Sequence, residues 1–227
     1  MSLVIDVGDR PGPARDRGVS AGAAAIKRGE LVVLPTESVY GLAADPFSAK
    51  AMRALRQAKG RGDDLPVGVL VGALRTVDGL ASGITADGRA LIEAFWPGPL
   101  TLVVREQPTL AWDIASGTGQ VSLRMPLHPV TLAVLAATGP LAVTSAQRAG
   151  SIPPRTCAEA EAQLASDVTL YLDAGAALAE APSSIVDLTA DTPVLLREGG
   201  YSVDALREVC PELVVPGETE PTGPSES

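Results

Sequence analysis

Aromatic side chains are scarce in this sequence: they make up only 3% of its 227 residues, whereas hydrophobic residues as a group make up 46%. The core must therefore be built from Val, Leu, Ile and Ala, which suit helices packed on a β-sheet. Long apolar runs are missing too. No stretch reaches the roughly 20 residues of a membrane-spanning helix, and no apolar segment follows a basic start as in a secretory signal. The sequence therefore predicts a cytoplasmic protein with no membrane segment.

Cysteine and histidine are nearly absent, which excludes several kinds of site. The two cysteines, Cys157 and Cys210, form no CxxC pair, so a disulfide scaffold or a cysteine-based zinc site is not expected. We interpret Cys157, at a helix start, as a structural thiol. His128 is the single histidine and is interpreted as a surface or capping residue. The phosphate-binding patterns GxxxxGK[ST] and GxGxxG are missing as well.

Positive charge is also in short supply, with 18 basic against 27 acidic residues and a net charge of −9. Non-specific nucleic-acid binding depends on neutralising phosphates with Lys and Arg, so this chain is a poor candidate for nucleic-acid binding as its main task. A local basic cleft stays open, because only the local field matters there. Lysine occurs only at positions 27, 50 and 59, and arginine supplies the rest of the positive charge, which favours forked contacts to carboxylate or phosphate.

Helical and strand patterns alternate along the chain, which predicts the α/β class. Helices are expected over 20–28, 48–58, 86–95, 129–137, 156–165 and 202–209. Strands are expected over 30–35, 67–71, 100–104, 120–124, 141–144, 168–172, 185–188 and 194–196. Because several strands are joined by short loops, we expect a twisted mixed β-sheet flanked by helices, with a ligand cleft.

Composition divides the chain into three parts. Residues 1–17 are rich in Pro, Gly, Asp and Arg and are interpreted as an N-terminal arm, in which residues 3–5 could add an edge strand. Residues 18–210 form the predicted domain. Residues 211–227 consist largely of Pro, Glu, Ser and Gly and are predicted to be a disordered acidic tail.

Polar residues suited to anion binding follow several predicted strands, at the ends where α/β sheets bind ligands. The segments, in chain order, are PTESVYGL (35–42), KGR (59–61), WPGPLT (96–101), RMP (124–126), SAQ (145–147), SSIVD (183–187) and LREG (196–199). Together they resemble the YrdC-like threonylcarbamoyl-AMP synthase family, whose segments PTETxYGL, KxRP, WPGPLT, RxP, SAN and STxxD–LRxG come in the same order. The resemblance runs from about Gly29 to Leu206 and implies the short form, without an additional C-terminal domain.

The resemblance implies an enzyme that joins L-threonine, bicarbonate and ATP into threonylcarbamoyl-AMP and pyrophosphate, for the t6A modification of tRNA. It also implies Mg²⁺ bound with the ATP phosphates rather than in a metal site of the protein. A partner tRNA threonylcarbamoyl transferase would receive the product. Because almost every reacting group is anionic, the protein needs placed cations and backbone donors more than proton-transfer residues.

Residue roles follow from the same resemblance. Catalysis is assigned to Lys59 and Arg61. Threonine binding is assigned to Thr36, Arg124, Ser145 and Ser183, with Arg124 holding the carboxylate. Nucleotide binding is assigned to Lys59, Arg61, Gln147 and Arg197. The residues alone leave other interpretations open: Lys59 and Arg61 could be solvated cations that offset a helix dipole, and Arg124 could form a strand-end salt bridge. Tyr40 and Trp96 are expected to be structural.

The sequence departs from the family pattern at a few positions. Gln147 replaces the Asn of SAN and is longer by a methylene, and Arg148 follows it where a small or apolar residue is usual. Gly62 replaces the Pro of KxRP, and two aspartates follow it. These changes leave two alternatives open: a related enzyme that makes or transfers another carbamoyl-adenylate, and a non-catalytic RNA-binding module on the same fold.

Overall fold

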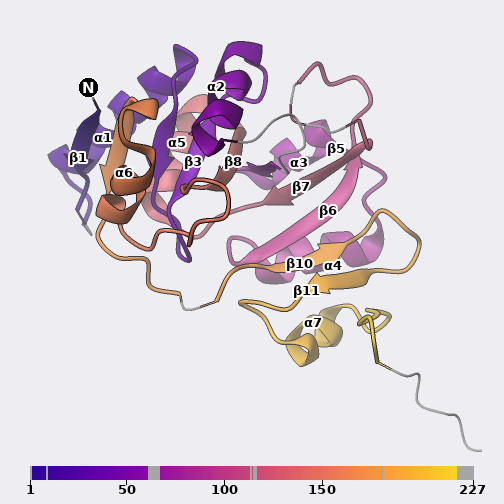
Figure 1. Ribbon diagram of the computed structural model, residues 1–227. Helices are drawn as coiled ribbons and strands as arrows, with labels where there is room; N and C mark the ends of the chain where they lie inside the picture. Colours follow the sequence, from indigo (N-terminus) through magenta and orange to yellow (C-terminus); the bar gives the residue numbers. More distant parts are fainter. Residues whose placement is uncertain are drawn as a thin grey trace, which may run out of the picture.

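Eleven short strands form one twisted mixed sheet among the residues that the computed structural model describes, namely 2–8, 10–60, 67–112, 114, 117–179 and 181–218 (Figure 1). The strands are β1 (Leu3–Asp6), β2 (Val32–Leu34), β3 (Gly41–Ala44), β4 (Gly68–Leu70), β5 (Ala81–Ser82), β6 (Leu100–Glu106), β7 (Gln120–Arg124), β8 (Leu141–Ser145), β9 (Leu170–Asp173), β10 (Ser184–Asp187) and β11 (Val194–Arg197). Their order is β1-β9-β2-β3-β8-β4-β7-β6-β10-β11, with β5 beside β6. The neighbours pair both parallel and antiparallel, which confirms the predicted mixed sheet.

Helices cover one face of this sheet fully and the other face only in part. They are α1 (Pro13–Lys27), α2 (Ala49–Lys59), α3 (Leu74–Leu80), α4 (Ala86–Phe95), α5 (Pro129–Thr138), α6 (Cys157–Leu164) and α7 (Val203–Val209), with a 3₁₀ turn at Ala165–Asp167. The larger apolar cluster joins α2, α3, α4, α6 and α7 to one face of the sheet. The smaller cluster joins only α1 and α5 to the other face, near β2 and β9. The smaller cluster includes Leu70 of β4 but no residue of β7, β6 or β10, so α1 and α5 do not cover that part of the face.

Residues 3–6 form an edge strand, as the sequence allowed for residues 3–5, and position 17/18 falls inside helix α1. Strand β1 pairs with β9 in parallel. Helix α1 starts at Pro13, well before the expected position 20, because Pro is favoured in the first turn of a helix. Gly18 lies in α1 where a Cβ atom would overlap the side chain of Val7, so the helix packs closely on the segment that follows β1.

Most other elements lie where the sequence predicts them. Helix α4 and strand β7 agree residue for residue with the expected ranges, and Ser48 caps α2 by accepting a hydrogen bond from the Ala51 N–H at 3.2 Å. Strands β10 and β11 pair with each other, as expected. Strands β3 and β5 and helix α3 were not predicted, because each is short and lacks a clear apolar period.

The first part of the predicted tail packs on the domain, which corrects the expectation for residues 211–218. Leu213 is only 2% exposed. The Val214 N–H donates to the Pro193 carbonyl at 2.9 Å, and the Val214 carbonyl accepts from the Leu195 N–H at 2.9 Å. An ion pair links Arg207 to Glu218, with 2.6 Å between Nη2 and Oε2. Residues 219–227 lie outside the described residues.

Deletion from Pro216 onward is expected to lower the melting temperature by less than about 4 °C. The deletion removes the pair between Glu218 and Arg207, and exposed ion pairs contribute about 0–1 kcal/mol. Leu213→Ala should cost about 2–5 kcal/mol, because it empties a buried position. Thermal unfolding of both variants beside the full chain checks this. A larger loss from the deletion than from Leu213→Ala would contradict it.

None of the helices in the described part of the chain combines the length and the apolar character needed to cross a membrane.

Candidate functional site

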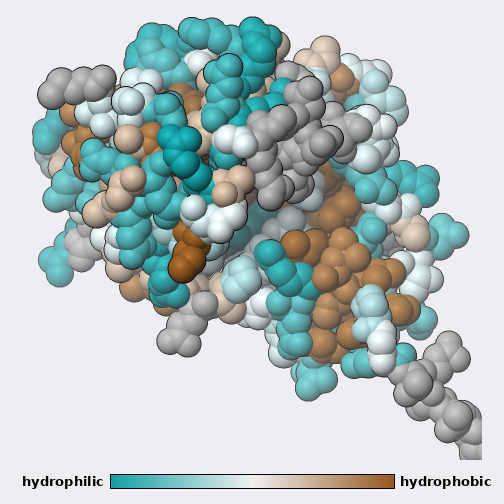
Figure 2. All heavy atoms as spheres, viewed as in Figure 1, coloured by the Kyte–Doolittle hydropathy of each residue, from teal (hydrophilic) through white to brown (hydrophobic). Residues whose placement is uncertain are grey.

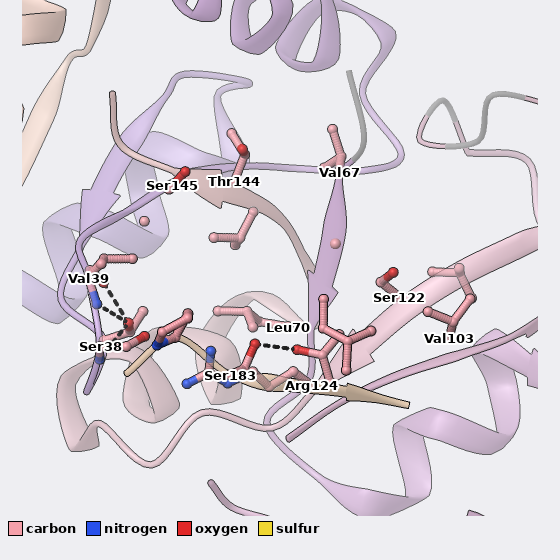
Figure 3. Close-up of a pocket in the computed structure, with 18 of the residues that line it drawn as sticks. Ser38, Val39, Val67, Leu70, Val103, Ser122, Arg124, Thr144, Ser145 and Ser183 are labelled. Carbon is pink, nitrogen blue, oxygen red and sulfur yellow. Dashed lines mark hydrogen bonds between the residues drawn. The ribbon is translucent and has the colours of Figure 1, made fainter. Parts of the chain in front are cut away.

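A cavity of about 640 Å³ lies on the partly covered face of the sheet. Alternation along β6 and β7 builds its floor. Leu100, Leu102 and Leu123 point into the core, whereas Thr101 and Ser122 alternate with them and line the cavity. The close-up in Figure 3 places Ser145 and Thr144 on one side of this space and Ser183 and Arg124 on another. Figure 2 shows the same face of the molecule as Figure 1, with apolar side chains gathered over β10 and β11.

Arg124, at the end of β7, is fixed at the cavity wall by an ion pair. Its Nε donates to the Gly98 carbonyl at 3.1 Å, and its Nη2 donates to the carboxylate of Glu37. The two side chains are only 12% and 13% exposed. Arg124 therefore forms the salt bridge that one interpretation expected. It also lines the cavity, where a ligand would contact it, as the other interpretation requires.

Arg197 stands at the edge of the same cavity and is held by Ser183. Its Nε and Nη2 donate to the Ser183 carbonyl at 3.0 and 2.8 Å, and Nη2 also reaches the Ser183 Oγ at 3.1 Å. That hydroxyl lies 2.9 Å from the hydroxyl of Thr101. Burial, and then the positive charge of Arg124, lower the pKa of Arg197. The guanidinium groups of Arg124 and Arg197 therefore repel each other across the cavity. An anion bound between them would offset this repulsion, so the cavity favours an anion.

Thr36 lies in the turn after β2, with its hydroxyl near the backbone. The hydroxyl donates to the Val39 carbonyl at 2.5 Å and accepts from the N–H groups of Ser38 and Val39 at 3.4 and 3.3 Å. Thr36 is 7% exposed and lines the cavity. It stiffens the turn that forms this wall, and this structural contact stands beside the predicted contact with threonine.

Lys59 is buried, which corrects the expectation that it is largely solvated without a ligand. The side chain is 4% exposed, and its Nζ donates to the Ser145 carbonyl at 2.6 Å. The Lys59 carbonyl accepts from the Ala149 N–H at 3.0 Å. The last turn of α2 therefore packs on the loop after β8, so that Lys59 ties this helix to the cavity wall. Arg61 lies outside the described residues, as do Gly62 and the two aspartates that follow it.

The two unusual residues after Ala146 behave differently. The Nε and Nη2 of Arg148 donate to the Gln163 carbonyl at 2.9 Å and to the Asp167 carboxylate at 2.8 Å, so this side chain is held at the end of α6. The side-chain oxygen of Gln147 is buried and has no hydrogen-bond partner among the described residues. A buried acceptor of this kind is costly unless a donor reaches it. Gln147 is not among the residues that line the cavity, so its contact with a nucleotide stays a prediction.

The residues expected to be structural are buried and hydrogen-bonded. The Trp96 indole N–H donates to the Leu100 carbonyl at 2.7 Å, and the Tyr40 hydroxyl donates to the Gly175 carbonyl at 2.6 Å. Cys157 is also buried, and burial raises the pKa of its thiol to about 12, which favours the unreactive form. His128 precedes α5, and burial lowers the pKa of its imidazole.

The cavity brings together five of the eight predicted site residues, namely Thr36, Arg124, Ser145, Ser183 and Arg197. Lys59 donates to the Ser145 carbonyl, and Gln147 follows Ser145 by two residues in the chain. Sequence reasoning missed Glu37 and Thr101 as members of the site, although both lie inside motifs that were singled out. The sequence did contain a signal for Glu37 and Thr101, because each is a polar residue near the end of a predicted strand and has apolar neighbours.

Comparison with known proteins places this chain and its fold in one family. The model of the Sua5–YciO–YrdC family, described as telomere recombination, matches residues 24–199. The chain belongs to this family. A Mycobacterium tuberculosis protein, provisionally named threonylcarbamoyl-AMP synthase, is 50% identical over 195 residues, which cover 86% of this chain and 90% of that protein.

Solved structures of the Sua5–YciO–YrdC family agree with the fold. Pyrococcus abyssi Sua5, crystallised as a complex with L-threonine, aligns with a TM-score of 0.88 and 31% identity. That alignment covers 94% of this chain and 62% of the Pyrococcus chain, so this chain spans less than two thirds of its length. Escherichia coli YciO aligns over all of its own chain with a TM-score of 0.80 and 24% identity, which supports the fold alone.

Proposed function

We propose that this member of the Sua5–YciO–YrdC family is an L-threonylcarbamoyladenylate synthase, which forms threonylcarbamoyl-AMP and pyrophosphate from L-threonine, bicarbonate and ATP. The observation that carries the proposal is the cavity in which Arg124 and Arg197 stand beside the hydroxyls of Thr36 and Ser183. Placed cations and neutral hydroxyls suit a reaction between anions. The Mycobacterium and Pyrococcus relatives support the same reaction through their names.

The chemistry proceeds in two steps. The threonine amine attacks the bicarbonate carbon, water leaves and a carbamate forms. A carbamate oxygen then attacks the α-phosphorus of ATP, while the bond from that phosphorus to the pyrophosphate oxygen breaks. Arg124 would hold the threonine carboxylate, and Arg197 with Lys59 would offset negative charge on the phosphates. Holding the reactants together is the main task of these side chains.

Mg²⁺ would arrive with ATP. Among the described residues no three His, Cys, Asp or Glu side chains gather as a metal site, and Mg²⁺ in nucleotide sites is commonly held by phosphate oxygens and water. The ion would neutralise part of the phosphate charge. The serine and threonine hydroxyls that line the cavity are neutral, and so is the amide of Gln147. These groups can therefore contact ATP with its Mg²⁺ without adding charge.

The wider assignment follows from the proposed product. A carbamoyl-adenylate is an activated mixed anhydride, so a second protein must take it up before water does, and we propose a tRNA threonylcarbamoyl transferase in the cytoplasm. Direct binding of tRNA by this chain would be weak, because its net charge is −9. The alternative of another carbamoyl-adenylate rests on Gln147, whose longer side chain replaces the usual Asn.

Pyrophosphate release is expected only when L-threonine, bicarbonate, ATP and Mg²⁺ are all present. The measurement is coupled detection of pyrophosphate, with each component omitted in turn and with serine or glycine in place of threonine. Turnover with serine, glycine or carbamoyl phosphate but not with threonine would assign the related carbamoyl-adenylate reaction instead. Gln147→Asn is the matched variant and should keep or raise activity. Activity confined to that variant would mean that the natural chain has lost the family reaction.

A further inference from the structure

Glu37 lies between the cavity-lining residues Thr36 and Ser38, and its carboxylate contacts the cavity-lining Arg124. One carboxylate oxygen accepts from Arg124 Nη2, and the other accepts from the Leu127 N–H at 3.4 Å. The Glu37 carbonyl accepts from the Ala179 N–H at 2.7 Å. One residue therefore joins the turn after β2, the end of β7 and the loop after β9, and its carboxylate is fixed in place.

The fixed carboxylate also sets the charge of the cavity. Arg124 and Arg197 both line it, and the positive charge of Arg124 acts on Arg197. Glu37, which is 13% exposed, cancels one of these two charges. The group of three therefore carries one net positive charge. Hydrogen bonds among the described residues use Nε and Nη2 of Arg124, so Nη1 is left to meet a ligand.

We propose that Glu37 is a specificity-determining residue: by cancelling one guanidinium charge and orienting Arg124, it makes the cavity accept a zwitterionic amino acid and disfavour dianions such as inorganic phosphate. This inference rests on the proposed function, in which an amino acid must bind beside a triphosphate. Phosphate groups of the nucleotide are then discouraged from entering the amino-acid end of the cavity, where they would bind unproductively.

Coulomb's law gives the direction of the effect. An amino acid carries one carboxylate and one ammonium, so loss of the Glu37 charge strengthens attraction for the first and weakens it for the second. Phosphate near pH 8 carries two negative charges, and both gain. At partly buried sites a unit charge acts over several ångströms with an energy on the scale of a tenfold change in affinity. Loss of the carboxylate should therefore change phosphate binding far more than threonine binding.

The test is calorimetric titration of the full chain with L-threonine and, separately, with inorganic phosphate, at low ionic strength and without ATP or bicarbonate. Glu37→Gln keeps the length and an acceptor oxygen but removes the charge. The ratio of the phosphate Kd to the threonine Kd is expected to fall at least tenfold. Glu37→Asp keeps the charge and should stay within about threefold of the natural ratio, although its shorter side chain should lower the rate of pyrophosphate release.

Glu198→Gln is the matched control, because it removes one carboxylate from an exposed position next to Arg197 and changes the net charge equally. Its ratio should equal that of the natural chain. An unchanged ratio in Glu37→Gln, or an equal fall in Glu198→Gln, overturns the inference. Should Glu37→Gln fail to fold, Arg197→Gln tests the same balance from the other side and must raise the ratio. An unchanged ratio there overturns the inference as well.

The outcome is separable from that of the proposed function. A natural chain that releases pyrophosphate with threonine, but whose Glu37→Gln variant shows no change of ratio, refutes the role of Glu37 alone. A natural chain that binds threonine and shows the change, but makes no pyrophosphate, refutes the synthase reaction and supports the role of Glu37.

Discussion

Lys59→Ala is expected to slow pyrophosphate release roughly 30- to 1000-fold and to destabilise the fold. The rate loss follows from about 2–4 kcal/mol of charged hydrogen bonding to the nucleotide, at about 1.4 kcal/mol for each factor of ten. The loss of stability follows from the buried contact between Lys59 Nζ and the Ser145 carbonyl at 2.6 Å. The Ser145 carbonyl keeps the hydrogen bond from the Gln147 N–H at 2.9 Å, so the variant loses one hydrogen bond to a charged group, which contributes about 1.5–3 kcal/mol. Steady-state kinetics and denaturant unfolding measure the two effects.

Two further variants separate these effects. Lys59→Met keeps the apolar part of the side chain, so it should recover part of the stability and none of the rate. Lys50→Ala removes a lysine from an exposed position of the same helix and should change neither quantity noticeably. Unchanged turnover and ATP affinity in Lys59→Ala would refute its role at the phosphates. The same kinetic test applies to Arg61→Ala, predicted from the sequence to lose rate while folding normally.

Gly199→Ala is expected to lower the free energy of unfolding by about 1–3 kcal/mol and the rate at least tenfold. A Cβ atom at this position would lie 2.6 Å from the Ser183 carbonyl carbon and 2.7 Å from its oxygen. Backbone atoms cannot move aside cheaply, and overpacking of this kind typically costs 1–3 kcal/mol. The displaced segment carries Ser183, whose contacts with Arg197 and Thr101 would be lost.

Gly79→Ala is the control for Gly199→Ala. Gly79 lies in α3, and a Cβ atom there would meet nothing within 4 Å. Alanine favours a helix more than glycine does, so this variant should be as stable as the natural chain or more stable by about 0.4–1 kcal/mol. Chemical unfolding of both variants, followed by initial-rate measurements, decides the matter. Equal rates for the two variants would show that the Ser183 segment tolerates displacement.

Local sequence patterns predicted the helices and strands whose apolar residues recur at a regular spacing. They failed where residues are buried by contacts with distant parts of the chain. The alternation of Leu100, Leu102 and Leu123 with polar residues identified β6 and β7 correctly. Strand β3 consists of four buried residues, GLAA, between two neighbouring strands, so it has no alternation of polar and apolar residues to detect. Leu213 stands among residues typical of a disordered tail, and only its packing on the domain shows its role.

The site followed the same rule. The resemblance named eight residues, and five of them line one cavity although they are far apart in the sequence. The burial of Lys59 could not be predicted, since a lysine at a helix end is usually solvated and its acceptor, Ser145, is distant in the sequence. The pairing of Arg124 with Glu37 joins residues 87 positions apart, and no local pattern indicates it.

The parallel bridge between Val194 and Val214 has a consequence for self-association. Strand β11, which carries both Arg197 and the exposed side chain of Leu196, is the last strand at its end of the sheet. An open edge of this kind, flanked by apolar side chains, is a template on which a second chain can add a strand. The segment around Val214 occupies that edge with hydrogen bonds of its own. The same few residues that close the domain therefore also protect the strand that carries Arg197 from pairing with a second chain and aggregating.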